Sequence, residues 1–301
     1  MVSILSLVIL NYNDSRTTIE LLKMAQGYYI IDHVIIVDNM STDNSLDILK
    51  EYESLKVKVI CSEKNGGYGY GNNYGVKYAI EHYDSDYVLI CNPDVVFSES
   101  SVRACLLILQ TISDAAVVAP RMININGEKN PYCVWKLGTW IEYLLSPLVC
   151  LRWILPNRFY DLDSVQKKIL EVDGVAGSML MINANHFLNC GMYDDNIFLY
   201  CEETVLGMKL KNAGFKSFLI MNEYFIHLHS VSINKSFDSE YKKRKLLWQS
   251  RLYVLEEYYK CLKAEMFFSK FIMNISLIEV QLITILKKIK SRLVKFLNII
   301  N

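Results

Sequence analysis

The residues best suited to chemistry are Asn92-Pro93-Asp94, which follow the apolar run at residues 87–90. A short apolar run that ends in a turn signal predicts a buried strand. Asp94 is therefore expected at the carboxyl end of a strand, where open α/β sheets bind ligands. Its carboxylate suits Mg2+ or Mn2+, and a diphosphate can fill the remaining coordination positions. The same residue types also fit an ordinary turn, so the choice depends on the surrounding chain.

Three other polar stretches also follow predicted strands. The runs at 5–10, 34–37 and 57–60 lead into Asn11, Asp38 and Asn65, respectively. Helical patterns separate these runs, which is typical of βαβ units on a mostly parallel sheet, with a fifth strand at 115–119 closing this half. Because the carboxyl ends of parallel strands share one edge, these residues and Asp94 are expected to meet at one crevice. Taken singly, Asp38 fits an N-cap or turn equally well.

A glycine-rich stretch at residues 65–75 precedes a helix expected to reach about residue 82. Five glycines in eleven residues allow backbone N–H groups to approach a phosphate or sugar closely, although a flexible loop has the same composition. The spacing matches neither the dinucleotide fingerprint nor the P-loop, which disfavours a dehydrogenase or a kinase. A nucleotidyltransferase would carry a basic glycine-rich loop after the first strand, and residues 11–14 offer none.

Two acids and two histidines further along could supply a base and another metal ligand. Glu202 and Glu203 open a helix expected over residues 202–212. Acids in a first turn are stabilised by the helix dipole; alternatively, one of them is a general base that faces the crevice. His227 and His229 follow the strand expected at 215–220. An imidazole can join oxygens on a transition metal, although a single histidine also fits a structural role.

Composition indicates a globular protein of one large or two small domains, with 301 residues and 52% hydrophobic content. The formal net charge is zero, so no global field favours a nucleic-acid partner. Eight cysteines form no C-x-x-C pair, which indicates buried thiols of a reducing compartment rather than a zinc or disulfide framework. The apolar start is too short for a signal peptide and lacks its basic region, so a cytoplasmic protein is expected.

Residues 121–171 differ from the sheet pattern. They contain a hairpin-turn signal at Asn126-Gly127 and three tryptophans, Trp135, Trp140 and Trp153. Such a stretch fits a helical subdomain that packs on the sheet. It equally fits an acceptor-binding lobe or a lipid contact, because tryptophan suits an interface with one wet and one apolar side.

The tail also differs. Residues 260–301 carry a net charge of +6, and residues 266–286 are largely apolar. This pattern indicates an amphipathic helix lying in the plane of an anionic membrane surface. A spanning helix would require Glu279 to be neutralised. A packed core helix or an oligomer contact is the alternative.

Taken in order, these motifs resemble a family 2 glycosyltransferase of the GT-A fold, of the rhamnosyltransferase-like kind found in bacterial surface-polysaccharide synthesis. The similarity runs from Ser6 to about Tyr259. Residues 9–13 resemble the family's opening strand and nucleotide loop, residues 37–43 its V-D-N-x-S-x-D segment, and residues 65–73 its glycine-containing loop. The resemblance implies an α/β fold with a mixed, mostly parallel sheet flanked by helices and a C-terminal helical extension.

The resemblance also implies a donor site, in which Asp38 binds the base of the nucleotide. Asn92-Pro93-Asp94 stands where the family has its D-x-D-like element, so one carboxylate, Asp94, is expected at the metal. Residues 227–232 resemble H-x-G-S-x-S, which makes His227 a metal ligand and His229 the runner-up. The residues expected to bind the donor are Asn11, Tyr12, Asn13, Asp38, Asn39, Ser41, Asn65, Gly66, Gly67, Asn72, Asn92 and Asp94.

On the acceptor side, residues 172–177 resemble V-D-G-x-x-G and residues 191–195 resemble G-x-(aromatic)-D-E, which implies acceptor binding by Asp173, Gly174, Gly177 and Asp194. Residues 198–206 resemble F-L-Y-x-E-D-x-D-L. The family's E-D is Glu202-Glu203 here, and its later Asp is Val205. The resemblance assigns the role of catalytic base to Glu203, with Glu202 beside it. The glutamate side chain is one methylene longer than the family's aspartate, so its position must be adjusted by about 1 Å to keep its carboxylate within hydrogen-bond distance of the acceptor hydroxyl.

The implied reaction is inverting, metal-dependent transfer of a sugar from a nucleoside-diphosphate sugar to a saccharide, with Mg2+ or Mn2+ as cofactor. Rhamnose is the favoured sugar, followed by galactose or galactofuranose. A polyprenyl-diphosphate-linked acceptor would explain attachment at the inner face of the cell membrane. Residues 1–120 are expected to bind the nucleotide sugar, 121–260 the acceptor, and 261–301 the membrane. The departures at Glu203 and Val205 also fit a catalytically inactive sugar-nucleotide-binding or scaffolding subunit.

Overall fold

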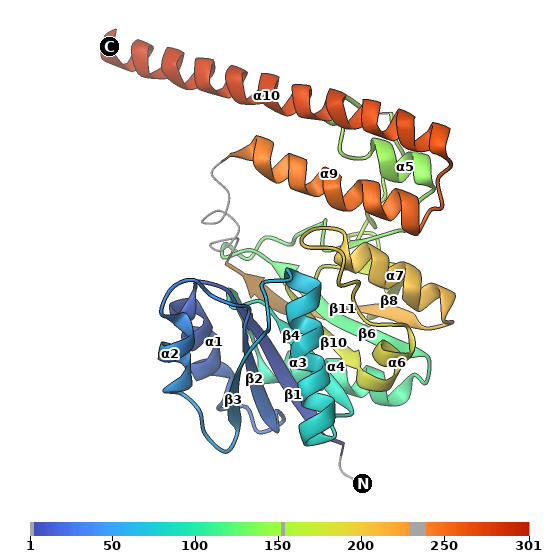
Figure 1. The fold of residues 1–301 in the computed structure, drawn as a ribbon. Helices are drawn as coiled ribbons and strands as arrows, with labels where there is room; N and C mark the ends of the chain where they lie inside the picture. The colour runs from blue at the N-terminus through green and yellow to red at the C-terminus, as the bar shows by residue number, and fades with distance from the viewer. Residues whose placement is uncertain (1–2, 152–153, 229–238, 301) are drawn as a thin grey trace. The chain divides into compact units, whose positions relative to one another are not determined.

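The computed structural model describes residues 3–151, 154–228 and 239–300, with side chains described as far as residue 290. The chain forms two compact units. The sheet unit comprises the residues up to Leu137 together with Arg158–Ile233, and the helical unit comprises Gly138–Asn157 and Asn234–Asn301. Figure 1 shows the elements of each unit. The expected division into donor, acceptor and membrane-binding ranges concerns ligands and stays a prediction.

A nine-stranded sheet forms the centre of the sheet unit, in the order β3-β2-β1-β4-β10-β6-β11-β5, with β8 paired to β11. Its strands are β1 (Leu5–Asn11), β2 (His33–Asp38), β3 (Val57–Cys61), β4 (Tyr87–Cys91), β5 (Val95–Phe97), β6 (Ala115–Ile123), β8 (Ile169–Val172), β10 (Met179–Asn183) and β11 (Lys216–His227). Strands β1, β2, β3, β4, β6 and β11 run in one direction, and the other three run against it. The expected mixed, mostly parallel sheet is confirmed.

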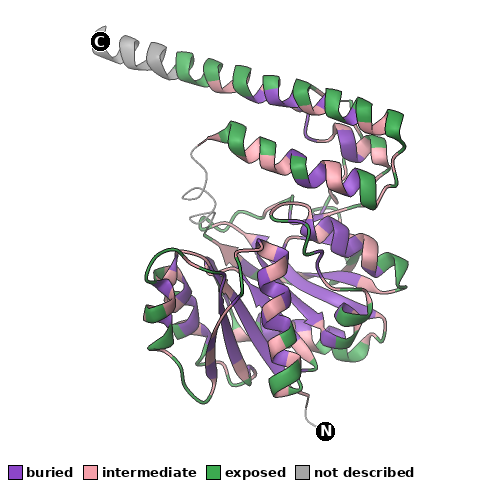
Figure 2. Ribbon diagram, in the orientation of Figure 1, coloured by how far each residue is buried: buried purple, intermediate pink, exposed green. Residues whose placement is uncertain are grey.

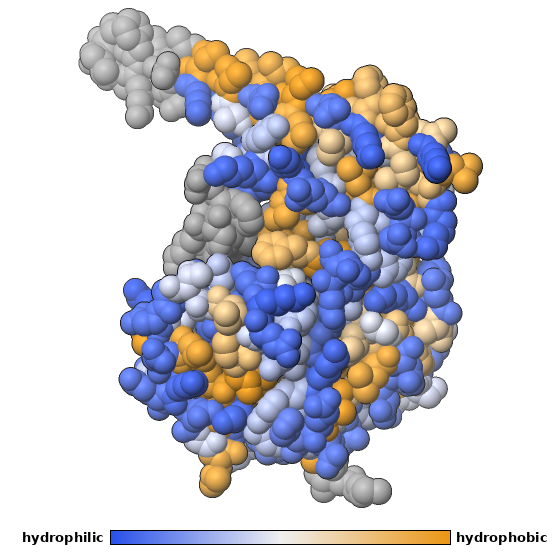
Figure 3. Space-filling model, viewed as in Figure 1, coloured by the Kyte–Doolittle hydropathy of each residue, from blue (hydrophilic) through white to orange (hydrophobic). Residues whose placement is uncertain are grey.

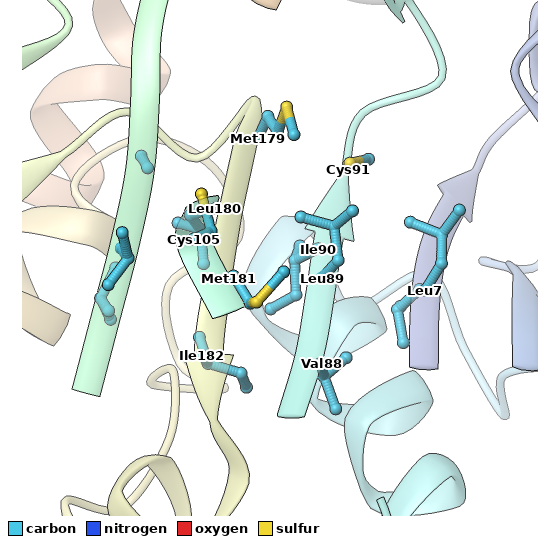
Figure 4. Close-up of a cluster of buried hydrophobic side chains, with 14 of the residues drawn as sticks. Leu7, Val88, Leu89, Ile90, Cys91, Cys105, Met179, Leu180, Met181 and Ile182 are labelled. Carbon is cyan, nitrogen blue, oxygen red and sulfur yellow. The ribbon is translucent and has the colours of Figure 1, made fainter. Parts of the chain in front are cut away.

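The apolar runs that predicted the strands form the core. Val88, Leu89 and Ile90 of β4 are fully buried, and burying an aliphatic side chain of this size contributes about 1.5–3 kcal/mol. Figure 4 shows these residues beside β10 and the Cys105 side chain, and Figure 2 shows that the strands are almost entirely buried. Both faces of the central strands are covered, which is why these strands are continuously apolar rather than alternating.

Among the described residues, six helices and a small second sheet complete this unit. Helix α3 packs on β1 and β2, α4 on β6 and β11, and α7 on β11 and the short strand β9. The helices are α1 (Ser15–Ala25), α2 (Ser45–Lys50), α3 (Tyr68–Tyr83), α4 (Glu99–Thr111), α6 (Ala184–Asn189) and α7 (Glu202–Asn212). The second sheet pairs β7 (Val134–Trp135) with β9 (Gly174–Val175).

The strand expected at 115–119 is confirmed and continues to Ile123 as β6. It does not lie beside β4, because β10 returns from later in the chain and pairs antiparallel with both β4 and β6. Residues 172–183 form no continuous strand: β8 ends at Val172, β9 covers Gly174–Val175 and β10 begins at Met179. The turn at Asn126-Gly127 is confirmed: the Gly127 N–H donates to Asn124 O, and the φ of Gly127 is +77°.

The helical unit contains α5 (Trp140–Leu145), the short 3-10 helix η1 (Val149–Leu151), α9 (Glu240–Glu257) and α10 (Lys263–Ile300). Helices α5 and α9 both pack against α10. The Arg251 guanidinium lies 3.8 Å from the centroid of the Tyr143 ring and donates to Ser146 Oγ, which joins α9 to α5. The expected C-terminal helical extension is confirmed. Trp153 lies outside the described residues.

Candidate active site

The polar loops leave the same edge of the sheet. Asn11 and Asp38 are register partners at the ends of β1 and β2. Strand β4 lies beside β1 and runs parallel to it, and it ends at Cys91 near the same edge. Asn65 and Asp94 follow β3 and β4, so all four loops begin at one edge, as parallel pairing requires.

Asp38 organises the first of these loops. Its carboxylate is 1% exposed and accepts hydrogen bonds from Asn11 Nδ2 at 2.8 Å, Ser41 N at 2.8 Å and Ser41 Oγ at 2.7 Å. Ser41 Oγ in turn accepts from Asn13 N at 2.9 Å. A carboxylate has about four acceptor positions, so three are already used to hold the loop. The remaining one is what Asp38 can offer to a nucleotide.

Asn39 connects this loop to the glycine-rich stretch. Its Nδ2 donates to Asn65 Oδ1 at 3.2 Å and to Gly67 O at 3.1 Å. Gly67 has a φ of +91°, and a Cβ there would collide with the carbonyl of Phe198. The structure therefore explains the glycine at position 67 by backbone conformation and close packing. Its expected approach to a phosphate stays a prediction.

Two further residues of the glycine-rich stretch have packing roles. A Cβ on Gly71 would collide with the Leu10 side chain, so this glycine lets α3 approach β1. Asn72 is fully buried, and its Nδ2 donates to Tyr68 O at 3.0 Å. Its Oδ1 is buried without a hydrogen-bond partner among the described residues, and donor binding by Asn72 stays a prediction.

Asp94 and His227 form the centre of the candidate metal site. Asp94 is 6% exposed, and its Oδ1 lies 3.2 Å from His227 Nε2. The short strand β5 follows Asp94 directly and pairs with the end of β11, which brings the histidine here. The strand expected at 215–220 in fact continues to His227. His229, the alternative ligand, lies outside the described residues.

The Asp94–His227 pair fits a divalent cation. Two adjacent ligands of an octahedral ion at about 2.1 Å are about 3 Å apart, close to the observed 3.2 Å. Within the described ranges, no group of three or more His, Cys, Asp or Glu side chains could hold a metal. Oxygens from a substrate or water would therefore complete the coordination shell.

Glu203 lies beside the same edge. It is half-buried, and its Oε1 accepts a hydrogen bond from Gly177 N at 3.0 Å. The next residue, Ser178, accepts from Asn92 N at 2.9 Å, so residues 177–178 connect this carboxylate to the loop that carries Asp94. Burial raises the pKa of Glu203, and the hydrogen bond from Gly177 opposes that shift. The acid is thus oriented and has a pKa above its usual range, as a base near neutral pH requires.

Glu202 is a poorer candidate for the base. It is 2% exposed, and in the described part of the chain its Oε1 is buried without a hydrogen-bond partner. Burial, followed by the charge of Glu203, raises its pKa well above the usual range. Tyr200 and Cys201, just before the pair, have φ values of 71° and 77°. Such conformations cost about 1–3 kcal/mol each and concentrate at functional sites.

The expected acceptor residues have mainly structural contacts. Asp173 accepts from Leu137 N at 2.9 Å and from Lys211 Nζ at 3.3 Å. Gly174 lies against the Trp135 ring. Asp194 is nearly buried and accepts from Asn196 N at 2.9 Å. Gly177 contacts a candidate catalytic side chain, Glu203, and acceptor binding by this set stays a prediction.

Sequence analysis missed Tyr68. Its hydroxyl donates to Gly177 O at 2.5 Å, although the two residues are 109 positions apart. No local pattern could have indicated this contact, because it depends on how α3 packs against the start of β10. The only available signal was a tyrosine in the glycine-rich stretch.

Solved structures place the fold in a known class. The chain resembles S. aureus TarS 1–349, with a TM-score of 0.52 over 87% of this chain and 68% of that one, at 15% identity. It resembles GalNAc-T7, whose structure contains UDP, GalNAc and Mn2+, with a TM-score of 0.58 over 90% and 54% of the two chains, at 13% identity. These likenesses show a GT-A-like fold.

Residues 6–179, more than half of the chain, match the profile described as glycosyl transferase family 2. The chain therefore belongs to glycosyl transferase family 2, and the resemblance noted in the motifs is confirmed.

Relatives at low identity include the rhamnosyltransferase WbbL of Escherichia coli K12, 24% identical over 68% of this chain and 81% of that protein. The low-salt glycan biosynthesis hexosyltransferase Agl10 of Haloferax volcanii is 27% identical over 67% of this chain. The N-acetylglucosaminyl-diphospho-decaprenol L-rhamnosyltransferase of Mycobacterium tuberculosis is 24% identical over 64%. The chain spans 60% of Agl10 and 66% of the mycobacterial protein.

Proposed function

We propose that this chain is an inverting, metal-dependent glycosyltransferase that moves a sugar from a nucleoside diphosphate to a saccharide during surface-polysaccharide synthesis. The observation that carries the proposal is the position of Glu203. Its carboxylate is held by Gly177 N–H, next to the strand end that presents Asp94 and His227. An acid and a cation-binding pair at one sheet edge are what sugar transfer to a hydroxyl requires.

In the proposed reaction, Glu203 accepts the proton of the acceptor hydroxyl while that oxygen forms a bond to the anomeric carbon. The bond between the anomeric carbon and the diphosphate breaks at the same time, on the opposite face of the sugar. Attack from the opposite face inverts the anomeric configuration. Burial and the charge of Glu203 raise the pKa of Glu202 well above its usual range, which favours Glu203 as the member of the pair that carries the negative charge.

Asp94 and His227 would hold Mg2+ or Mn2+, which offsets negative charge on the departing diphosphate when it is bound. Related folds support this choice, because the structures of GalNAc-T7 and of the mannosyltransferase PcManGT contain Mn2+. The loop held by Asp38 would contact the nucleotide. Asn92 would lie between the donor and the catalytic base, since its backbone N–H donates to Ser178 O, next to Gly177.

The rhamnosyltransferase relatives favour rhamnose as the transferred sugar, ahead of galactose or galactofuranose. The name of the mycobacterial relative specifies a diphospho-decaprenol acceptor, which supports a polyprenyl-diphosphate-linked saccharide as the acceptor here.

A panel of sugar nucleotides tests the donor. TDP-rhamnose, UDP-galactose and UDP-galactofuranose are each added to the purified protein, and thermal shifts are measured with and without Mn2+. We expect one donor to raise the melting temperature, and to raise it more with Mn2+. A shift that is equal with and without the ion would contradict the metal assignment.

Two variants test the chemistry. Asp94→Ala and Glu203→Gln should each abolish transfer while leaving the circular-dichroism spectrum unchanged. The inactive-subunit alternative predicts that the wild type also fails to transfer or hydrolyse the donor that it binds in Mn2+. Normal turnover by either variant would remove that residue from the mechanism.

We also propose that the chain attaches to anionic lipid through one face of α10. The apolar face of α10 consists of Phe267, Phe268, Phe271, Ile275, Ile278, Leu282, Ile285, Leu286 and Ile289, all exposed. Figure 3 shows the apolar colour along this helix. Lys270, Lys288 and Lys290 lie at its flanks and are also exposed. Exposed phenylalanines beside lysines are typical of helices that bind anionic lipid in the plane of the surface.

The one acid within the apolar stretch of α10 does not interrupt this face. Glu279 turns inward, where its two carboxylate oxygens accept from Val149 N at 2.9 Å and Cys150 N at 2.7 Å. By length and composition alone, residues 263–290 could also cross a membrane. Crossing would remove Glu279 from these partners, so the in-plane arrangement is favoured. It would place the enzyme at the inner face of the cell membrane.

Vesicle flotation tests the attachment. Wild-type protein should float with phosphatidylcholine vesicles that contain 30% phosphatidylglycerol. With vesicles of phosphatidylcholine alone, it should stay at the bottom of the gradient. The pair Phe271→Ser and Ile278→Ser should weaken flotation at least tenfold, because each loses more than about 1 kcal/mol of apolar burial. Leu55→Ser, a fully exposed leucine elsewhere, is the control. If the pair instead converts a dimer to a monomer and leaves flotation unchanged, the face is an oligomer contact.

A further inference from the structure

Gly177 is held from two sides by side chains of different helices. Tyr68, the first residue of α3, donates from its hydroxyl to Gly177 O. Gly177 N donates to Glu203 Oε1 on α7. A Cβ at residue 177 would lie 2.5 Å from Glu203 Oε1 and 2.7 Å from the Tyr68 hydroxyl. Only a glycine fits between the two groups, so the short backbone segment is fixed by both contacts.

The Tyr68 hydroxyl is itself fixed in place. Its ring meets the Tyr193 ring edge-on, with 5.7 Å between centroids. Its backbone N–H donates to Phe198 O at 3.0 Å, in the segment that leads into Glu202 and Glu203. Burial, followed by the nearby Tyr193 and Glu203, raises the pKa of Tyr68 well above its usual range. The hydroxyl therefore keeps its proton and acts as a donor.

We propose that Tyr68 is a positioning residue, whose hydroxyl holds Gly177 so that the Gly177 N–H orients the Glu203 carboxylate. Tyr68 touches neither reacting atoms nor the carboxylate. It links the glycine-rich stretch of the expected donor side to the base of the expected acceptor side. The inference rests on the proposed function only where Glu203 is named as the base.

The consequence is a coupling between Tyr68 and the protonation of Glu203. A hydrogen bond from an N–H group favours the ionised carboxylate. If Gly177 is released, that bond weakens, and the pKa of Glu203 rises further. The other titratable groups around Glu203 are Glu202 on the same helix, Tyr193, and Asp173 across a small shared cavity. None of them contacts Gly177 O. Tyr193 does interact with the Tyr68 side chain, so Tyr193→Phe is measured beside Tyr68→Phe to separate its influence.

The test uses the full chain labelled with [15N]glycine, which gives thirteen amide signals. The signal that moves with pH in the wild type, and no longer does so in Glu203→Gln, belongs to the amide bonded to Glu203. In Tyr68→Phe, which keeps the ring, we expect this amide to exchange with solvent about tenfold faster. We also expect its titration midpoint to move to higher pH. Tyr70→Phe is the matched control, because among the described residues the Tyr70 hydroxyl makes no hydrogen bond.

The two proposals fail separately. Unchanged exchange and an unchanged midpoint in Tyr68→Phe would overturn the positioning role, whatever the enzyme does. Full transfer by Glu203→Gln would overturn the base assignment and leave the nuclear magnetic resonance result standing. If Tyr68→Phe does not fold, 4-aminophenylalanine at position 68 keeps the ring and places an N–H donor where the hydroxyl stands. Wild-type exchange in that variant supports the role, and fast exchange opposes it.

Discussion

The carboxyl edge of the sheet and the apolar face of α10 depart from the usual burial pattern in opposite ways. At the sheet edge, charged and amide side chains such as Asp38 and Asn39 are buried. On α10, phenylalanines and isoleucines are exposed while Glu279 is turned inward. A buried polar group is tolerated when its hydrogen bonds are made, and a contiguous exposed apolar face indicates a contact surface. Both regions therefore have the properties of a binding surface, one polar and one apolar.

The comparison separates two kinds of stabilisation. Polar groups at the sheet edge hold one another, so removing one leaves several partners unpaired. Side chains on the apolar face of α10 are between 36% and 79% exposed, so their removal should affect folding much less. We expect large effects on stability at the first region and mainly effects on binding at the second.

The largest loss is expected from Asp38→Ala. It leaves Asn11 Nδ2 and both hydrogen-bond donors of Ser41 without their acceptor, which should lower the free energy of unfolding by about 3 kcal/mol. Urea denaturation measures the change. The exposed Asp47→Ala should stay within about 0.5 kcal/mol of the wild type, and an equal loss in both variants would show that the network at Asp38 is not special.

Glu279→Ala should have an intermediate effect. Two backbone N–H groups, at Val149 and Cys150, lose a charged acceptor, at a cost of about 2 kcal/mol. Hydrogen exchange at residues 149–150 should become faster. Glu279→Gln, which keeps an acceptor oxygen, should lose less. If exchange is unaffected in Glu279→Ala, the inward acid does not fix the helical unit, and the argument against a spanning α10 weakens.

The last effect has the opposite sign and is expected from Glu202→Gln. A carboxyl group whose pKa is raised by folding binds its proton more tightly in the native state than in the unfolded state. Its contribution to the free energy of unfolding is therefore fully present below the pKa that the group has in the unfolded chain. That contribution is lost as pH rises above about 4.3. The glutamine does not titrate. Denaturation curves should therefore show the variant gaining stability over wild type between pH 4 and pH 8, by about 1.4 kcal/mol for each unit of pKa shift. A constant difference across this range would show that Glu202 is not buried as an acid.

Much of the fold follows from local pattern. The first four strands and α7 occur where apolar runs and an acidic helix start predicted them. Strand β5, with three residues, is too short to give a pattern, yet it places His227 beside Asp94. The position of β10 was unpredictable for another reason: its apolar sequence fits any interior position in a sheet, and its neighbours are chosen by tertiary packing.

The candidate site, like the fold, could be predicted only where it depends on local sequence pattern. Spacing identified the loops of Asp38 and Asp94, because each loop follows its own strand. Whether an amide such as Asn72 faces a ligand or the core depends on helix packing, and the sequence does not carry that information. The inward direction of Glu279 and the contact from Tyr68 to Gly177 join residues more than 100 positions apart. No local rule reaches that far.

The insertion of β10 between β4 and β6 has a consequence for synthesis on the ribosome. Until residue 183 has left the exit tunnel, β4 presents an unpaired edge, and such edges promote association between nascent chains. The amino-terminal half is therefore not an independent folding unit, although it contains all of the expected donor-binding residues. Fragments that end before β10 should depend on chaperones, whereas fragments that include it should be able to complete the centre of the sheet.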